Sequence, residues 1–285
     1  MKVIDIHVHI NPWRMYTPGA LETFFRGKTD REKIKNYMDE PAAFLRYMDE
    51  NEVERAGLIQ YVSDIIGFTA EINDFISRYC QTDRRRLFAF GGIHPVTCPD
   101  VEKEMSRLIR QLRIRAFKIH PPHQEFAANA YRQGLKGLAA FYRICEAEGI
   151  PVMIHTGTSI FPGARNVYAD PLACDDVAVD FPSLKLILAH GGRPIWMETA
   201  FFLLRRHPNV WLDISGIPPQ SLLQYFPRFE IIAHRTLFGT DWPSPGVREI
   251  SDNVRHFLAL PLSEEVQRRV LRDNAAGVLD EAAGA

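Results

Sequence analysis

Eight short runs of apolar and β-branched residues recur along the chain, and this repetition most constrains what it can fold into. Each run has the length and composition of a buried strand: they cover residues 2–9, 56–62, 87–94, 116–120, 151–155, 184–190, 209–215 and 236–241. Segments with helical periodicity lie between them, at residues 42–53, 101–112, 135–149 and 195–207. Strands that alternate with helices predict right-handed crossovers and a parallel sheet.

Two parallel architectures are consistent with this pattern. An open, doubly wound sheet usually has a glycine-rich phosphate-binding turn after its first strand, whereas this chain has HVHINPW (7–13) there. Eight strand–helix units in 285 residues fit a closed barrel. The sequence therefore predicts an α/β fold, a (β/α)₈ TIM barrel that forms a single domain over residues 1–285.

Residues 11–40 form a long polar and aromatic stretch between the first strand and the first barrel helix. We expect a long insertion after strand 1, on the side of the barrel that carries active sites, where it can cap the mouth. Its aromatic residues can wall an apolar ligand or pack on the barrel: they include Trp13, Tyr16, Phe24 and Phe25.

Composition excludes several classes of function. The formal net charge of −1 provides no overall field that would draw the protein to nucleic acid or anionic lipid. No run approaches the roughly 18 consecutive apolar residues of a membrane span. The first residues read as a strand and not as a secretory signal, so we expect a cytoplasmic protein. We expect a small-molecule substrate, with no nucleic-acid or membrane partner, and leave a homodimer open.

Six of the eight predicted strands end in a residue that can bind a metal or move a proton. Histidines scattered at random would lie mostly on helices and loops, but half of the ten in this chain end strands. Because the carboxyl ends of barrel strands meet at one face, these side chains are candidates for a single site: they are His9, His94, His120, His155, His190 and Asp241.

His7 and His9 are separated by one residue. Residues two apart on a strand point to the same face, about 6 to 7 Å apart at the backbone, so both imidazoles can reach one ion. Because the motif is short, the pair alone fits two ordinary strand histidines better than a metal clamp. Its position at the end of the first strand, with His155 and Asp241 on other strands, favours chelation.

Five motifs together resemble a known family. They are DIHVHINP (5–12), VMIHTG (152–157), ILAHGG (187–192), LDISG (212–216) and LFGTDWP (237–243), and a closing DNAAGVL (273–279) extends the match to the C-terminal helix. In order and spacing they resemble the amidohydrolase superfamily, in particular its amidohydrolase-2 (amidohydrolase-related) branch of metal-dependent hydrolases and decarboxylases.

The resemblance implies a metal site. His7, His9 and His155 would be metal ligands, Asp241 a fourth ligand or a group beside the metal, and His190 a proton donor or acceptor. Asp241 and His190 would be the catalytic residues. Neutral imidazoles and a carboxylate suit one divalent zinc ion best, although manganese, iron and cobalt also accept these ligands. Such an ion lowers the pKa of bound water to roughly 7.

Four further residues are expected to bind substrate. Lys118 and His120 share one face of the fourth strand. For Lys118, a substrate-orienting or structural role is favoured over a carboxylated lysine that bridges a second metal, because this branch usually works with one ion. His120 can contact the substrate or, with Pro121 and Pro122 after it, fix a loop. Arg193 can bind a substrate carboxylate through two hydrogen bonds or face solvent. Trp242, directly after Asp241, can shape the pocket.

Two reactions share such a site. We predict hydrolysis of a small carboxylated or cyclic ester or amide substrate, such as a lactone, by metal-activated water. The alternative is nonoxidative decarboxylation of an aromatic or conjugated carboxylic acid, as in the resorcylate and aminocarboxymuconate semialdehyde decarboxylases of this branch. The fold does not choose between them. A barrel that had lost catalysis would show a substituted key residue, and none is substituted.

Overall fold

Eight parallel strands form the centre of the molecule. The computed structural model describes residues 1–284, and its strands follow one another around a single sheet in sequence order. The strands are β1 (Val3–Val8), β2 (Val53–Ile59), β3 (Leu87–Gly92), β4 (Ala116–Ile119), β5 (Val152–His155), β6 (Leu186–Ala189), β7 (Val210–Asp213) and β8 (Thr236–Leu237). The parallel sheet of eight strands predicted from the sequence is confirmed.

Backbone hydrogen bonds join the first strand to the segment that follows the last one. The amide of Ile6 donates to Phe238, the amide of Asp241 to His7, and the amide of His9 to Trp242. These bonds bring the first and last strands of the barrel together, so Asp241 lies beside His7 and His9 although β8 itself ends at Leu237.

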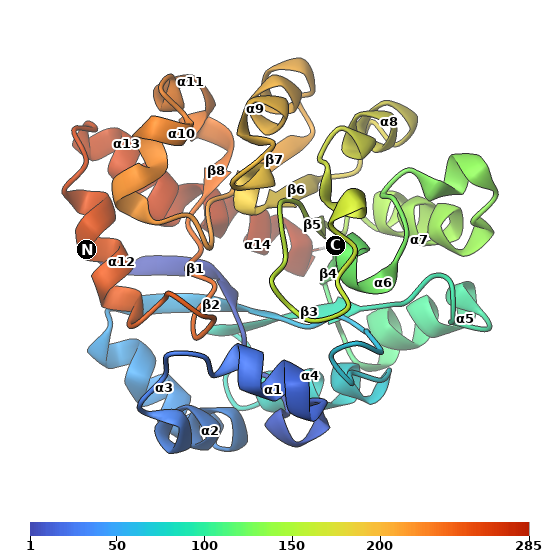
Figure 1. The fold of residues 1–285 in the computed structure, drawn as a ribbon, viewed down its shortest axis with the longest axis horizontal. Helices are drawn as coiled ribbons and strands as arrows, with labels where there is room; N and C mark the ends of the chain where they lie inside the picture. The colour runs from blue at the N-terminus through green and yellow to red at the C-terminus, as the bar shows by residue number, and fades with distance from the viewer. Residues whose placement is uncertain (285) are drawn as a thin grey trace.

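Helices surround the strands (Figure 1). The larger ones are α3 (Pro41–Glu50), α4 (Glu71–Cys80), α5 (Val101–Ser106), which continues as a π-helix over Arg107–Gln111, α7 (Lys136–Ala147), α8 (Ala173–Asp180), α9 (Met197–Arg206), α12 (Ile250–Leu258) and α14 (Asn274–Gly284); α6 (Pro121–Gln124), α10 (Leu222–Tyr225), α11 (Phe229–Ile232) and α13 (Glu264–Arg268) are short. Among residues 1–284, no helix combines the length and apolar character that a membrane span needs.

Inward-facing residues change from apolar to polar along the strands. Because side chains alternate between the two faces of a strand, residues two apart share the barrel interior. Near the strand starts the interior is apolar, and α14 covers this end with Val278 and Leu279. Two residues later on three strands the inward side chain is polar: Ala116 precedes Lys118, Met153 precedes His155, and Trp211 precedes Asp213. The polar groups therefore gather at the carboxyl end of the barrel.

The segment over residues 11–40 contains a short 3₁₀ helix (Trp13–Met15), α1 (Pro18–Phe24) and α2 (Arg31–Asp39). Two of its aromatic side chains, Tyr16 and Phe24, line a cavity at the carboxyl end of the barrel. Trp13 instead donates a hydrogen bond to Asp39 away from that cavity. That this segment is an insertion relative to related barrels stays a prediction.

Candidate metal centre and substrate cavity

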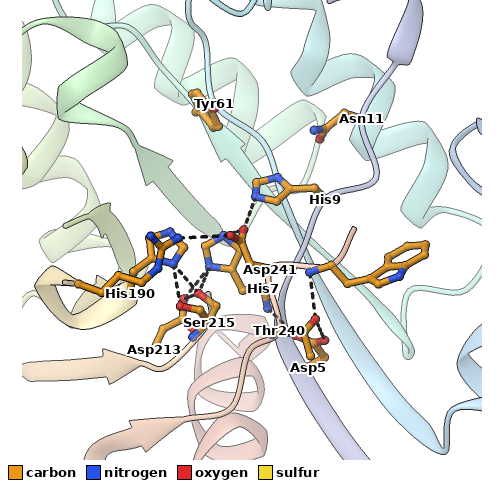
Figure 2. Close-up of polar contacts among 12 residues, drawn as sticks. Asp5, His7, His9, Asn11, Tyr61, His190, Asp213, Ser215, Thr240 and Asp241 are labelled. Atoms are coloured by element: carbon orange, nitrogen blue, oxygen red, sulfur yellow. Dashed lines mark hydrogen bonds and ion pairs between the residues drawn. The ribbon is translucent and has the colours of Figure 1, made fainter. Parts of the chain in front are cut away.

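A cavity of about 540 Å³ opens at the carboxyl end of the barrel. Eight of the predicted site residues line it: His7, His9, Lys118, His120, His155, His190, Arg193 and Asp241. Figure 2 shows the side chains of His7, His9, His190 and Asp241 converging at one place. The structure thus brings together residues that are more than 200 positions apart in the sequence.

His7 is held in one orientation by a carboxylate. Its Nδ1 atom lies 2.6 Å from Oδ2 of Asp213 and 3.0 Å from Oγ of Ser215, and Ser215 also donates to Asp213. Burial, with Lys118 nearby, holds the pKa of His7 well below its usual value, so the ring is neutral. Nδ1–H therefore donates to Asp213 and the Nε2 lone pair remains free.

Nε2 of His7 is buried and has no hydrogen-bond partner among the described residues. One ligand atom from each of His7, His190 and Asp241 lies within 4.8 Å of the others, which is close enough for one ion to join them. An imidazole lone pair without a partner is costly in a protein interior unless a ligand uses it. These residues fit a divalent metal ion, and their nitrogen and carboxylate donors match the chemistry of zinc or manganese.

Asp241 is the negative charge of the cluster. Burial works to raise its pKa, but the hydrogen bond from His9 and the nearby His7 and Arg193 lower the pKa to about 2. Its Oδ1 atom lies 3.0 Å from Nε2 of His9 and 3.5 Å from Nε2 of His7. An ionised carboxylate in contact with two imidazoles is a suitable anionic ligand for a divalent ion.

The backbone at two of these residues has an unusual conformation. His190 has φ of 65° and Asp241 has φ of 68°, both in the left-handed region that residues other than glycine avoid. Such conformations cost on the order of 1–3 kcal/mol and tend to occur at functional sites. Asp5 stabilises the conformation at Asp241, because the amide and the hydroxyl of the preceding residue, Thr240, both donate to the carboxylate of Asp5.

His190 and His155 differ in how they are held. Nδ1 of His190 donates to the carbonyl oxygen of Ser215 at 2.9 Å, so its Nε2 is the free nitrogen of a ring whose pKa burial lowers. His155 instead has Nε2 3.1 Å from the carbonyl oxygen of Gly157, and its ring stacks on that of His120. The geometry therefore groups His190 with His7 and Asp241, whereas the resemblance assigned the ligand role to His155.

Two cationic side chains face the same cavity. Lys118 is 1% exposed, and its Nζ atom has no hydrogen-bond partner in the described part of the chain. Burial lowers the pKa of Lys118 to about 8, against the opposing effect of Asp213 and Asp241. Arg193 lies over Gly216, where any side chain would collide with the guanidinium, and its Nη2 is 3.7 Å from Asp241.

One prediction about a side-chain position needs correction. Trp242 was predicted at the pocket, but its ring is 2% exposed and stacks on Tyr47 and Phe44 of α3, outside the cavity. Consecutive residues point to opposite sides, so a residue next to Asp241 faces the helices when Asp241 faces inward. His94, another strand-end histidine, lines a second hollow and not this one.

Sequence reasoning also missed residues that shape the site. Asp213 and Ser215 lie within the motif LDISG, which resembles the family's motif but predicts no chemical role for either residue. Continuing the two-residue period from Trp211 would have placed Asp213 inward. His123 gave no comparable signal, because it lies in the short helix α6 directly after two prolines.

A family model described as Amidohydrolase matches residues 4–280. No curated protein matches the sequence. Among solved structures, a TIM-barrel protein, Bb4693, from Bordetella bronchiseptica is 22% identical with a TM-score of 0.78, covering 99% of both chains.

Two further solved structures are enzymes with named activities. A dihydroxybenzoic acid decarboxylase from a Polaromonas species, with bound manganese and the inhibitor 2-nitroresorcinol, is 18% identical with a TM-score of 0.69, covering 98% of this chain and 97% of that one. A 4-oxalomesaconate hydratase from Rhodopseudomonas palustris is 20% identical with a TM-score of 0.66, covering 99% and 97%. At these identities the similarity establishes the barrel fold.

Proposed function

The chain belongs to the amidohydrolase family of metal-dependent enzymes, and from that premise we propose that it removes the carboxyl group of a small aromatic or conjugated carboxylic acid without oxidation. The sequence analysis instead predicts hydrolysis and gives decarboxylation as the alternative. The solved structures with similar folds include decarboxylases and a hydratase, which supports the alternative reaction better than a lactone hydrolase.

The observation that carries this proposal is the buried ammonium group of Lys118. A buried cation without a partner costs several kcal/mol, and a substrate carboxylate entering the cavity would offset much of that cost. Arg193 adds a second cation at the same cavity. The site therefore suits an anionic substrate better than a neutral one.

The cavity walls suit a flat, apolar substrate body. Aromatic side chains from separate segments line it: Tyr16, Phe24, Tyr61 and Phe161. Aromatic walls favour planar ligands through stacking and edge contacts. Together with the two cations, they fit an aromatic or conjugated acid.

The reaction breaks the bond between the ring or chain carbon and the carboxyl carbon. The electron pair stays on the carbon, which takes up a proton, and carbon dioxide leaves. We assign the transfer of that proton to Asp241 and His190, because both side chains line the cavity. Lys118 and Arg193 hold the acid in place.

We propose that His7, His9, His155 and Asp241 hold one divalent ion. When bound, such an ion supplies positive charge that polarises and orients an oxygen of the substrate. Manganese is a candidate metal in addition to zinc, because the structure of the decarboxylase from the Polaromonas species contains bound manganese. His190 is left outside the ligand set and free to move a proton.

Hydrolysis remains the second candidate because of one observation. The pKa of Asp241, about 2, keeps this carboxylate ionised near neutral pH, so it can accept a proton from water during attack on an ester or amide. Turnover of a panel of lactones and aromatic acids, including 2,6-dihydroxybenzoate, in ¹⁸O-labelled water separates the two reactions. Carbon dioxide release supports decarboxylation, and label in a product carboxylate contradicts it.

A further inference from the structure

Three side chains form a hydrogen-bonded chain along one wall of the cavity. His123 Nε2 lies 2.7 Å from Oγ of Ser159, and His123 Nδ1 lies 3.1 Å from the hydroxyl oxygen of Tyr61. The three residues come from separate elements: the segment after β2, helix α6 and the segment after β5. Tyr61 and Ser159 line the cavity, and His123 connects them from behind.

The hydrogen-bonded chain of Tyr61, His123 and Ser159 is held in place at its centre and at its serine end. The ring of His123 is buried and stacks on His120 with 3.5 Å between ring centroids and 16° between planes. The amide of Ser159 donates to the side chain of Asn166, whose Nδ2 donates back to the carbonyl oxygen of Ser159. The serine hydroxyl therefore has a fixed location on the cavity wall.

The direction of the hydrogen bonds follows from counting protons. Burial raises the pKa of Tyr61 well above its usual value, so its hydroxyl keeps its proton. Within residues 1–284, the hydroxyl has one hydrogen-bond partner, Nδ1 of His123, so Tyr61 donates to that nitrogen. Burial also lowers the pKa of His123 to about 3, so the ring carries a single proton, which must be on Nε2.

Ser159 is consequently left with a donor and no free acceptor. Its Oγ atom accepts from Nε2–H of His123 and, at 3.3 Å, from the amide of Phe161. Both lone pairs are then occupied, and the hydroxyl proton is available to the half-buried cavity side. A ligand atom that meets this hydroxyl has to be a hydrogen-bond acceptor.

We propose that Ser159 is a substrate-binding residue that donates a hydrogen bond to a second oxygen of the acid, and that Tyr61 and His123 are positioning residues that aim it. The inference rests on the proposed function for its substrate class and narrows that class. The preferred acid carries, besides the carboxylate received by Lys118, an oxygen acceptor such as a phenolate, carbonyl or second carboxylate.

Steady-state kinetics with the acid that the enzyme turns over best test this role. Ser159→Ala should raise KM about tenfold and leave kcat within about twofold, which corresponds to one lost hydrogen bond. Ser159→Thr should keep KM near the wild-type value because it retains the hydroxyl. For an analogue that lacks the second oxygen, wild type and Ser159→Ala should have the same KM.

Ser63→Ala is the matched control. The hydroxyl of Ser63 contacts the carbonyl oxygen of His123 at 3.5 Å instead of its ring, and it does not line the cavity. This variant should keep the wild-type KM. A KM for Ser159→Ala within twofold of wild type, or one raised equally in Ser63→Ala, would overturn the proposal.

The tautomer of His123 gives a readout that does not depend on turnover. ¹⁵N NMR of the full-length protein should show the proton on Nε2, and Tyr61→Phe should shift the population toward Nδ1–H. A wild-type ring with its proton on Nδ1 overturns the inference whatever the substrate. A panel in which no acid is decarboxylated contradicts the proposed function, and the NMR result then decides the direction of the hydroxyl separately.

Discussion

Nδ1 of His7 lies 2.6 Å from Oδ2 of Asp213, across the interior of the barrel from β1 to β7. This contact fixes both the orientation of the imidazole and the nitrogen that carries its proton. It leaves the Nε2 lone pair of His7 directed at Asp241, 3.5 Å away. A carboxylate that orients a ligating histidine in this way raises the basicity of the free nitrogen and the affinity for metal.

We predict that Asp213→Asn lowers the affinity for Mn²⁺ about 10- to 100-fold, because the amide no longer holds the His7 ring as a carboxylate does. Isothermal titration of the metal-free protein measures this. Asp175→Asn is the matched control, since Asp175 contacts Nε2 of His207 at the same 2.6 Å away from the cavity. Equal losses in the two variants would show that the effect is not local.

The division of roles between His155 and His190 is tested by metal content. We predict that His7→Ala and His155→Ala purify with less metal, whereas His190→Ala keeps its metal and loses turnover. Elemental analysis of the three variants gives the occupancy. If His190→Ala empties the site and His155→Ala does not, the ligand set is the close group of His7, His190 and Asp241.

Lys118→Met should abolish turnover and stabilise the fold at neutral pH. The pKa of Lys118 is lowered to about 8 in the folded protein, against 10.5 when unperturbed. The folded state therefore binds this proton less tightly than the unfolded state. Below pH 8, the buried charge of Lys118 lowers the free energy of unfolding by on the order of 3 kcal/mol, and this loss diminishes as the pH rises from 8 to 10.5.

Urea unfolding at several pH values measures this difference between wild type and Lys118→Met. The gain in stability from the substitution should shrink as the pH rises from 8 to 10.5. Lys136→Met, at an exposed position at the start of α7, should show no such trend. A gain that does not depend on pH would mean that Lys118 is not a buried charge.

Gly239 provides room for the His7–Asp213 pair. A Cβ atom there would lie 2.5 Å from Oδ1 of Asp213 and 2.8 Å from Cβ of His7. Gly239→Ala should destabilise the protein by roughly 1–3 kcal/mol and lower its metal content. Gly277→Ala in α14, where an added Cβ meets nothing within 4 Å, should leave the metal in place and increase stability slightly; unfolding curves and elemental analysis compare the two.

The sequence was sufficient to predict the barrel and the location of the site. Strand and helix alternation predicts parallel strands, and histidines at strand ends point to the carboxyl face, because both signals are local and periodic. Asp213 could have been placed inward by the same period, but its contact with His7 depends on how strands close around the barrel. Trp242 was predicted at the pocket because it follows Asp241, although consecutive residues of an extended backbone point to opposite sides. His123 and Ser159 meet only through tertiary structure.

Central to the proposed function is one divalent ion bound between His7 of β1 and Asp241, at the carboxyl end of the barrel. Anomalous diffraction from crystals of the full chain grown with Mn²⁺ tests it most directly. We predict one peak, about 2 Å from Nε2 of His7, from the imidazoles of His9 and His155, and from a carboxylate oxygen of Asp241. The absence of a peak beside His7 and Asp241, or a second peak on Lys118, would contradict the account.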